Sequence, residues 1–118
     1  MKRFLSAVLG GVVLLGAVAG AEAGNSASGT VTQIIITNAG GTGNLGVGLF
    51  TLTGSKVSAP ACNTIGNRWA IDLGASGGKA AYAAVLAAYL SGKTLSVNGT
   101  GDCGIWGDTE SALYVITP

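Results

Sequence analysis

Ten residues near the end of the chain carry most of the side chains that could do chemistry. The stretch GDCGIWGDTE, residues 101–110, holds one of two cysteines, one of two tryptophans and three of five acidic residues. Lectin-type sites stack a sugar on an aromatic ring and hold its hydroxyl groups with carboxylates and amides. Trp106, Asp108 and Glu110 supply such groups, so we predict a glycan-binding site at these three residues.

A structural role is the alternative for the same residues. Trp106 would then pack over a bridge between the two cysteines as part of the core. Asp108 or Thr109 would turn the chain into the strand that follows. The sequence leaves both interpretations open.

The same stretch does not favour catalysis or metal binding. Asp102, Asp108 and Glu110 could form a carboxylate pair of the glycosidase kind, but such pairs lie in a deep cleft of a larger scaffold. The chain has no histidine. The spacing of the three acids also differs from that of the calcium-binding EF-hand loop. We therefore predict no enzyme activity, no catalytic residue, no cofactor and no metal site.

The start of the chain has the pattern of a secretory signal peptide. Lys2 and Arg3 precede an uncharged run over residues 4–20, which ends at small residues suited to cleavage. The run is shorter than the roughly 20 apolar residues of a membrane span, and glycines interrupt it. We predict that residues 1–23 are a signal peptide and that residues 24–118 form one small secreted or periplasmic domain without a membrane span.

The predicted mature chain is formally neutral. It keeps four basic side chains, which do not cluster, against four acidic ones. Nucleic-acid binding and electrostatic attachment to membranes both need clustered lysines or arginines. Neither kind of partner is predicted.

Cys62 and Cys103 are the only cysteines of the chain. In an exported protein, such a pair most simply forms one disulfide. Closing a loop of this length contributes about 4 kcal/mol in the chain-entropy model. Reactive thiols are the alternative, but they favour a Cys-x-x-Cys spacing or a histidine nearby.

The residue pattern predicts a mainly β fold with one helix. Residues 24–29 are small and polar and predict an irregular start. Several later segments are rich in β-branched residues or alternate between apolar and polar residues, which predicts strands. One segment is rich in alanine, which predicts a helix. The order βββαββ is that of a five-stranded oligonucleotide/oligosaccharide-binding (OB-type) barrel. An open α+β sheet with one packed helix is the alternative. The predicted strands are residues 30–37, 47–54, 68–73, 94–98 and 112–117, and the predicted helix is residues 79–91.

The predicted helix has two apolar faces. A stripe of larger side chains is expected to pack on the core, namely Tyr82, Val85, Leu86, Tyr89 and Leu90. No charged residue lies between Ala80 and Ser91, and a helix that is apolar all round is usually covered on both sides. We predict a homo-oligomer interface at Ala80, Ala84, Ala87 and Ala88; an exposed alanine face is the alternative.

The segment GKAAYAAVLAAYLSGKTLSVNGTGDC, residues 78–103, carries a resemblance to a known family. With the order of the strands around it, it resembles the exported bacterial B subunits of AB-type toxins, among them those of the subtilase cytotoxin kind. The resemblance implies an OB-type barrel, pentamers with helices at the centre and binding of host glycans. No sugar-contacting residue of the family can be matched in this sequence. The predicted function is a secreted, oligomeric, possible glycan-binding module; a secreted structural or interaction protein is the alternative.

Overall fold

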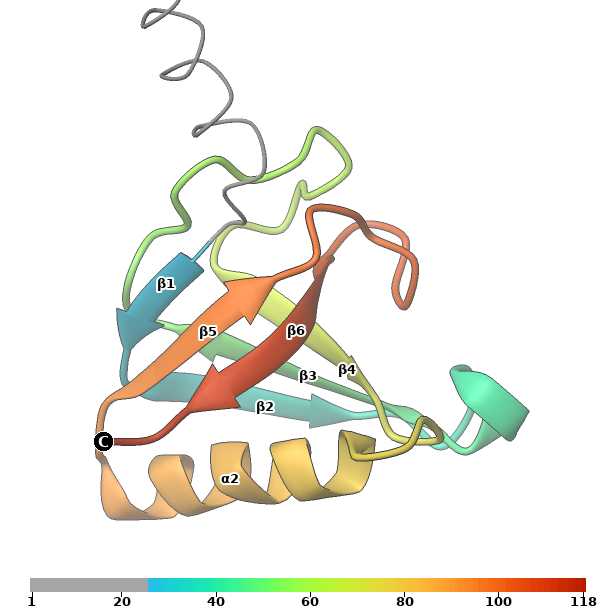
Figure 1. The fold of residues 1–118 in the computed structure, drawn as a ribbon, viewed down its shortest axis with the longest axis horizontal. Coiled ribbons are helices and arrows are strands. Elements are labelled where there is room, and N and C mark those ends of the chain that lie inside the picture. Colours follow the sequence, from blue (N-terminus) through green and yellow to red (C-terminus); the bar gives the residue numbers. More distant parts are fainter. Residues whose placement is uncertain (1–25) are drawn as a thin grey trace, which may run out of the picture.

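The computed structural model describes residues 26–118, so the predicted signal peptide, residues 1–23, lies outside the described residues. The described part is mainly β with one α-helix, as predicted (Figure 1). No helix within residues 26–118 combines the length and the hydrophobicity needed to cross a membrane. The elements are β1 (Ser26–Gly29), β2 (Val31–Ile36), the 3-10 helix η1 (Thr42–Asn44), β3 (Val47–Leu52), β4 (Arg68–Asp72), α2 (Gly78–Ser91), β5 (Leu95–Gly99) and β6 (Glu110–Ile116).

The strands form a curled, half-barrel sheet of six strands in the order β1-β5-β6-β4-β3-β2. The predicted closed barrel of five strands is therefore wrong, and the alternative, an open sheet with one packed helix, fits the structure. The additional strand is β1, which precedes the predicted first strand and pairs with β5, whereas β2 lies within the predicted first strand and pairs with β3. A register irregularity between Val31 and Gln33 lies at the start of β2.

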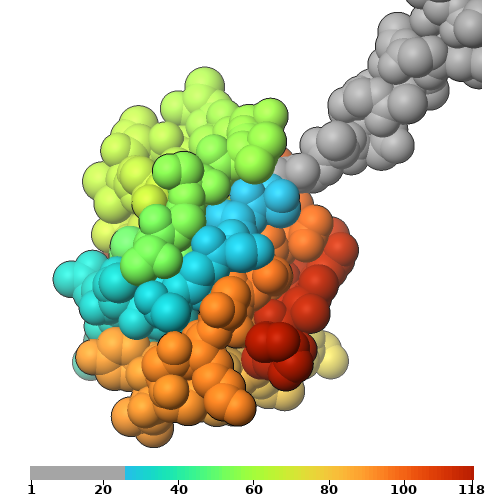
Figure 2. Space-filling model, turned by 90° about the vertical axis from the view of Figure 1, so that its left-hand side faces the viewer, coloured from blue at the N-terminus to red at the C-terminus, as the bar shows by residue number. Residues whose placement is uncertain are grey.

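The first strand was not expected from its composition. Residues 26–29 are small and polar, yet they pair in register with β5, with Ser26 opposite Asn98. On the side of β1 away from β5, the backbone N–H of Val57 donates to the carbonyl of Ser26 at 3.2 Å. Figure 2 shows this segment between β5 and the loop that follows β3. The prediction of an irregular start is corrected because backbone pairing, not side-chain propensity, holds β1.

Strands β4 and β6 are parallel and pair over two residues only. Trp69 lies opposite Glu110 and Ala70 lies opposite Ser111. Beyond Ser111 the two strands diverge, and α2 packs against both of them (Figure 1). The side of β6 that faces β4 therefore has no strand partner over residues 112–116 among the described strands.

The main core lies between the sheet and α2. Tyr82 contributes both an apolar ring and a hydrogen bond, because it meets Phe50 edge-on and its hydroxyl donates to the carbonyl of Leu49 at 3.0 Å. Burial raises the pKa of Tyr82 to about 12. The buried members of this core are Ala27, Val31, Phe50, Leu52, Trp69, Ile71, Tyr82, Val85, Ala88, Leu95 and Val97.

A second, smaller cluster covers the other face of β3 and β4. The alternating pattern of β4 predicts that Ala70 faces solvent, but Ala70 is fully buried beside Val47 and Leu49. Ile105 and Trp106 pack on this cluster from the loop between β5 and β6. Ala70 is thus covered by a segment far away in sequence, which a local pattern does not report.

Helix α2 spans the predicted residues and ends at Gly92, whose φ of 70° is the left-handed conformation that terminates helices. Its buried face consists of Gly78, Tyr82, Val85 and Ala88. Tyr89 is 42% exposed and Leu90 is 82% exposed. The expectation that these two side chains enter the core is wrong, because the small side chain of Ala88 takes the inward position of the last turn.

Candidate functional site

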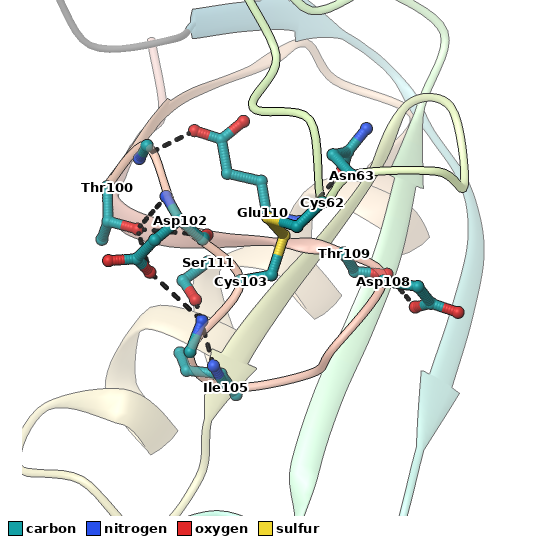
Figure 3. Close-up of a disulfide and its surroundings, with 12 residues drawn as sticks. Cys62, Asn63, Thr100, Asp102, Cys103, Ile105, Asp108, Thr109, Glu110 and Ser111 are labelled. Atoms are coloured by element: carbon teal, nitrogen blue, oxygen red, sulfur yellow. Dashed lines mark hydrogen bonds between the residues drawn. A yellow bond between two sulfur atoms is a disulfide. The ribbon is translucent and has the colours of Figure 1, made fainter.

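The predicted disulfide is confirmed. Cys62 and Cys103 are joined, with their Cα atoms 6.2 Å apart (Figure 3). The bond links the loop between β3 and β4 to the loop between β5 and β6. A structural disulfide is compatible with an exported protein.

Asp102 organises the turn that contains Cys103. Its carboxylate accepts hydrogen bonds from the Thr100 hydroxyl at 3.0 Å and from the Gly104 N–H at 3.2 Å. The carbonyl of Asp102 accepts from the N–H of Ser111 at 2.9 Å. These bonds return the chain to the start of β6 (Figure 3). Asp102 therefore has a structural role in this loop.

Asp108 forms an ion pair on the other side of the disulfide. The Arg68 guanidinium donates to its carboxylate at 2.6 Å and, through Nε, to the Thr109 hydroxyl at 2.9 Å. The Asp108 side chain is 45% exposed, so one flank of this carboxylate remains open to solvent. The pair links β4 to the residues that lead into β6.

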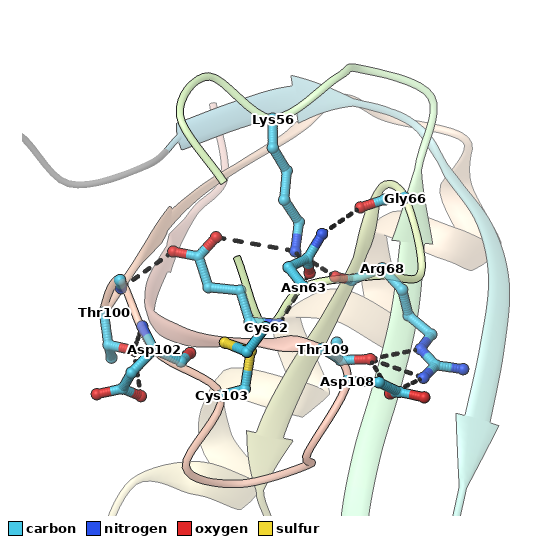
Figure 4. Close-up of polar contacts among 12 residues, drawn as sticks. Lys56, Cys62, Asn63, Gly66, Arg68, Thr100, Asp102, Cys103, Asp108 and Thr109 are labelled. Carbon is cyan, nitrogen blue, oxygen red and sulfur yellow. Dashed lines mark hydrogen bonds and ion pairs between the residues drawn. A yellow bond between two sulfur atoms is a disulfide. The ribbon is translucent and has the colours of Figure 1, made fainter. Parts of the chain in front are cut away.

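Glu110 points inward, to a buried amine. Its side chain is fully buried, and one carboxylate oxygen lies 3.9 Å from Nζ of Lys56, whose side chain is 2% exposed (Figure 4). The same Nζ donates to Oδ1 of Asn63 at 2.6 Å and to the carbonyl of Arg68 at 2.5 Å, and it lies 4.0 Å from the ring centre of Trp69. Lys56, Asn63 and Glu110 therefore form one buried polar cluster next to the disulfide.

Burial dominates the electrostatics of Lys56. Desolvation lowers the pKa of its amine from 10.5 to about 8, although the nearby Glu110 carboxylate acts in the opposite direction and Arg68 adds a smaller lowering effect. With this pKa about a tenth of the amine is neutral at pH 7, far more than for an exposed lysine. Such a lysine is a stronger nucleophile than an exposed one.

The three residues predicted to bind a ligand occupy three different environments. Trp106 is half-buried on the second cluster, Asp108 is paired with Arg68, and Glu110 is inaccessible beneath the disulfide. The structure does not bring them together around one space. Glu110 begins β6 and its side chain points to Lys56, whereas Trp106 and Asp108 lie in the loop before β6 and contact the second cluster and Arg68.

A concave groove lies between the first half of α2 and the edge of β6. It encloses about 540 Å³. The groove exists because β6 leaves β4 after Ser111 and because the helix presents only small side chains there, Ala80, Ala81 and Ala84. Tyr114 and Leu113 line its β6 side, and Asp72 and Ser76 line the end at the start of the helix.

Asp72 lines this groove and carries a carboxylate that hydrogen bonds hold in place. Its carboxylate accepts from the N–H of Thr42 at 2.9 Å, from the Thr42 hydroxyl at 2.7 Å and from the N–H of Gly74 at 2.9 Å. The hydrogen bonds from Thr42 and Gly74 hold the pKa of Asp72 below 3.8. The carboxylate is therefore ionised at neutral pH and keeps one orientation.

A smaller recess continues along the same helix. It lies between Ala87 and Ala88 on α2 and the last two residues, Thr117 and Pro118. Figure 2 shows the carboxyl terminus beside the end of α2. Of the predicted interface alanines, Ala80 and Ala87 are exposed and Ala84 is half-buried, whereas Ala88 belongs to the core.

The sequence prediction did not include the groove. Two signals were present: the alanines of α2, which leave space beside a helix, and the exposed aromatic Tyr114 in the last strand. Neither signal reveals that β4 and β6 separate. Among residues 26–118, no group of three or more acidic or cysteine side chains could hold a metal ion.

Comparison of the chain with protein-family models, with curated proteins and with solved structures finds no match. The function is therefore argued from the geometry described above.

Proposed function

We propose that this protein is an exported, non-enzymatic binding module that holds a glycan in the groove between α2 and β6. The observation that carries this proposal is the combination of a 540 Å³ groove with an exposed aromatic ring on one side and a fixed carboxylate at one end. Sites for small ligands are typically concave and mainly apolar, with a few oriented polar groups.

The residues of the groove have the properties that sugar binding requires. Tyr114, which is 48% exposed, offers a ring on which the apolar face of a pyranose can stack. Asp72 and Ser76 offer an acceptor and a hydroxyl group for sugar hydroxyls. The alanine floor leaves room for a flat ring between the helix and the strand.

Replacing Tyr114 with alanine is expected to weaken glycan binding about tenfold, the effect of losing one stacking contact. A glycan array on the wild-type protein selects the ligand, and calorimetry with that ligand measures the dissociation constant of each variant. The stability of Tyr114→Ala should remain close to that of the wild type, since the ring is half-exposed.

The matched control is Tyr89→Ala, which removes a tyrosine of similar exposure on α2 that does not line the groove. It should bind like the wild type. Equal binding by Tyr114→Ala and the wild type would place the site elsewhere, and an array without any bound glycan would refute the proposed function.

Assembly with further copies of the chain through β6 is a second candidate function. β6 and the residue after it, residues 110–117, carry no charge beyond the buried Glu110, and the strand exposes Leu113, Tyr114 and Ile116. Natural edge strands are usually protected by charges, prolines or a cover, and an unprotected edge pairs readily with another strand. This feature supports a homo-oligomer, the assembly implied by the resemblance to toxin B subunits.

We expect the wild-type protein to be oligomeric at micromolar concentration and Leu113→Lys to be monomeric, because a charge on the stretch of β6 that leaves β4 opposes pairing. Light scattering coupled to size exclusion gives the molar mass of both. The control is Leu45→Lys, at a side chain of similar exposure in the loop before β3, which should leave the assembly unchanged. A monomeric wild type would contradict assembly through β6 but not glycan binding.

A further inference from the structure

The buried cluster of Lys56, Asn63 and Glu110 has the composition of a reaction centre. Nζ of Lys56 is 2.6 Å from Oδ1 of Asn63. A carbonyl oxygen and its carbon are about 1.2 Å apart, so Nζ lies within about 3.8 Å of the amide carbon Cγ. An amine and an acyl carbon are thus held next to each other, and the amine itself is buried.

We propose that Lys56 and Asn63 form an intramolecular isopeptide bond, with Glu110 as the proton acceptor. This modification is separate from the proposed ligand groove. It would join the side chains of two residues within the loop between β3 and β4 (Figure 4).

The reaction balances without any co-reactant. The lone pair of the neutral Lys56 amine attacks Cγ of Asn63, and a bond forms between Nζ and Cγ. Glu110 takes a proton from the attacking nitrogen and returns it to Nδ2 of Asn63. The bond between Cγ and Nδ2 then breaks, and ammonia leaves. No atom is oxidised or reduced, and the product is a secondary amide.

The contacts of Asn63 prepare its amide for this attack. Oδ1 accepts a second hydrogen bond, from the backbone N–H of Glu110 at 2.9 Å, which stabilises negative charge that develops on the oxygen. Nδ2 donates to the carbonyl of Gly66 at 3.0 Å. These partners fix which side of the amide is oxygen and which is nitrogen. The neighbouring Cys62 disulfide holds the backbone of Asn63 in place.

The contacts of Lys56 and Glu110 suit a nucleophile and a base. Burial favours the neutral amine, as its lowered pKa indicates. One oxygen of Glu110 lies 3.9 Å from Nζ, and the other accepts from the N–H of Gly101 at 3.1 Å, which directs the carboxylate toward the amine. A small rotation of the side chain brings the base within hydrogen-bond reach of the proton it must accept.

Gly99 lies directly against this carboxylate. A side chain at position 99 would collide with Oε2 of Glu110 and would approach the ring of Trp69 to 2.6 Å. Glycine at this position therefore allows strand β5 to close over the cluster.

Mass spectrometry of the purified wild-type protein tests the proposal. The denatured and reduced chain is expected to be lighter than its sequence by about 17 Da, the mass of one ammonia. Trypsin should also fail to cleave after Lys56, because an acylated lysine is not a substrate, while cleavage after Arg68, Lys79 and Lys93 continues. Fragment spectra should locate the link between Lys56 and Asn63.

Three variants identify the atoms involved. Lys56→Arg and Asn63→Ala should each have the full mass, and Glu110→Gln should lose the cross-link while circular dichroism reports whether it folds. Lys79→Arg, at an exposed lysine, and Asn38→Ala, at an exposed asparagine, are controls that should keep the mass loss.

A folded wild-type protein of full mass that trypsin cleaves after Lys56 would overturn the proposal. The loss of 17 Da in Lys56→Arg would also overturn it, because ammonia would then come from another site, such as a succinimide at Asn98-Gly99. Cross-linking that persists in folded Glu110→Gln would refute the role of Glu110 as the base.

Discussion

A variant without the disulfide, Cys62→Ser with Cys103→Ser, is expected to lose about 4 kcal/mol of unfolding free energy relative to the wild type. The two cysteines are 41 residues apart in sequence, and opening a loop of this length restores considerable entropy to the unfolded chain. Small domains have total stabilities of only about 5–15 kcal/mol. Urea unfolding followed by tryptophan fluorescence measures the difference.

The wild-type protein under reducing conditions is the matched comparison, because it lacks the bond but keeps both side chains. It should unfold at the same urea concentration as the double variant. An unchanged midpoint in both samples would mean that the hydrogen bond between Asn63 and Glu110 and the Arg68–Asp108 ion pair hold the two loops without the disulfide.

Trp69→Ala is expected to be about as destabilising, with a loss of about 3–5 kcal/mol, the usual cost of removing a fully buried aromatic side chain. Trp69 is 0% exposed and is among the largest fully buried side chains of the described chain. Its ring also lies 4.0 Å from the amine of Lys56. The substitution therefore removes core volume and the packing of the ring on the Lys56 side chain together. Circular dichroism in increasing urea gives the free energy of unfolding.

Trp106→Ala is the matched control, because it also removes one tryptophan. Trp106 is half-buried on the smaller cluster, so its removal leaves the main core intact and should cost distinctly less. Equal losses in the two variants would contradict the division of the structure into a main core and a peripheral cluster.

Local patterns predicted most of the elements. The β-branched run Val31–Ile36 is a strand, and the alanine-rich segment is helix α2, ended by Gly92 as expected. Pairing of the two cysteines followed from their number and from the predicted export. These features depend on short-range propensities or on composition, both of which a sequence displays directly.

The closed barrel and the ligand residues could not be predicted in the same way. The pairing of β1 with β5 and the short pairing of β4 with β6 depend on contacts between distant segments. The grouping of Trp106, Asp108 and Glu110 assumed that neighbours in sequence share a surface. Each of the three instead contacts a different distant segment. Asn63, the partner of Lys56, is an ordinary loop residue in the sequence, and only the fold brings β6 beside it.

The positions of the two ends of the described chain determine how binding assays should be arranged. β1 starts at Ser26 opposite Asn98, away from the last turn of α2, whereas Thr117 and Pro118 lie beside Ala87 and Ala88. An affinity tag fused after Pro118 would crowd the alanine face of the helix. Immobilising a protein that begins near Ser26 through its amino-terminal end would instead present that helix, and the groove next to it, to a dissolved ligand.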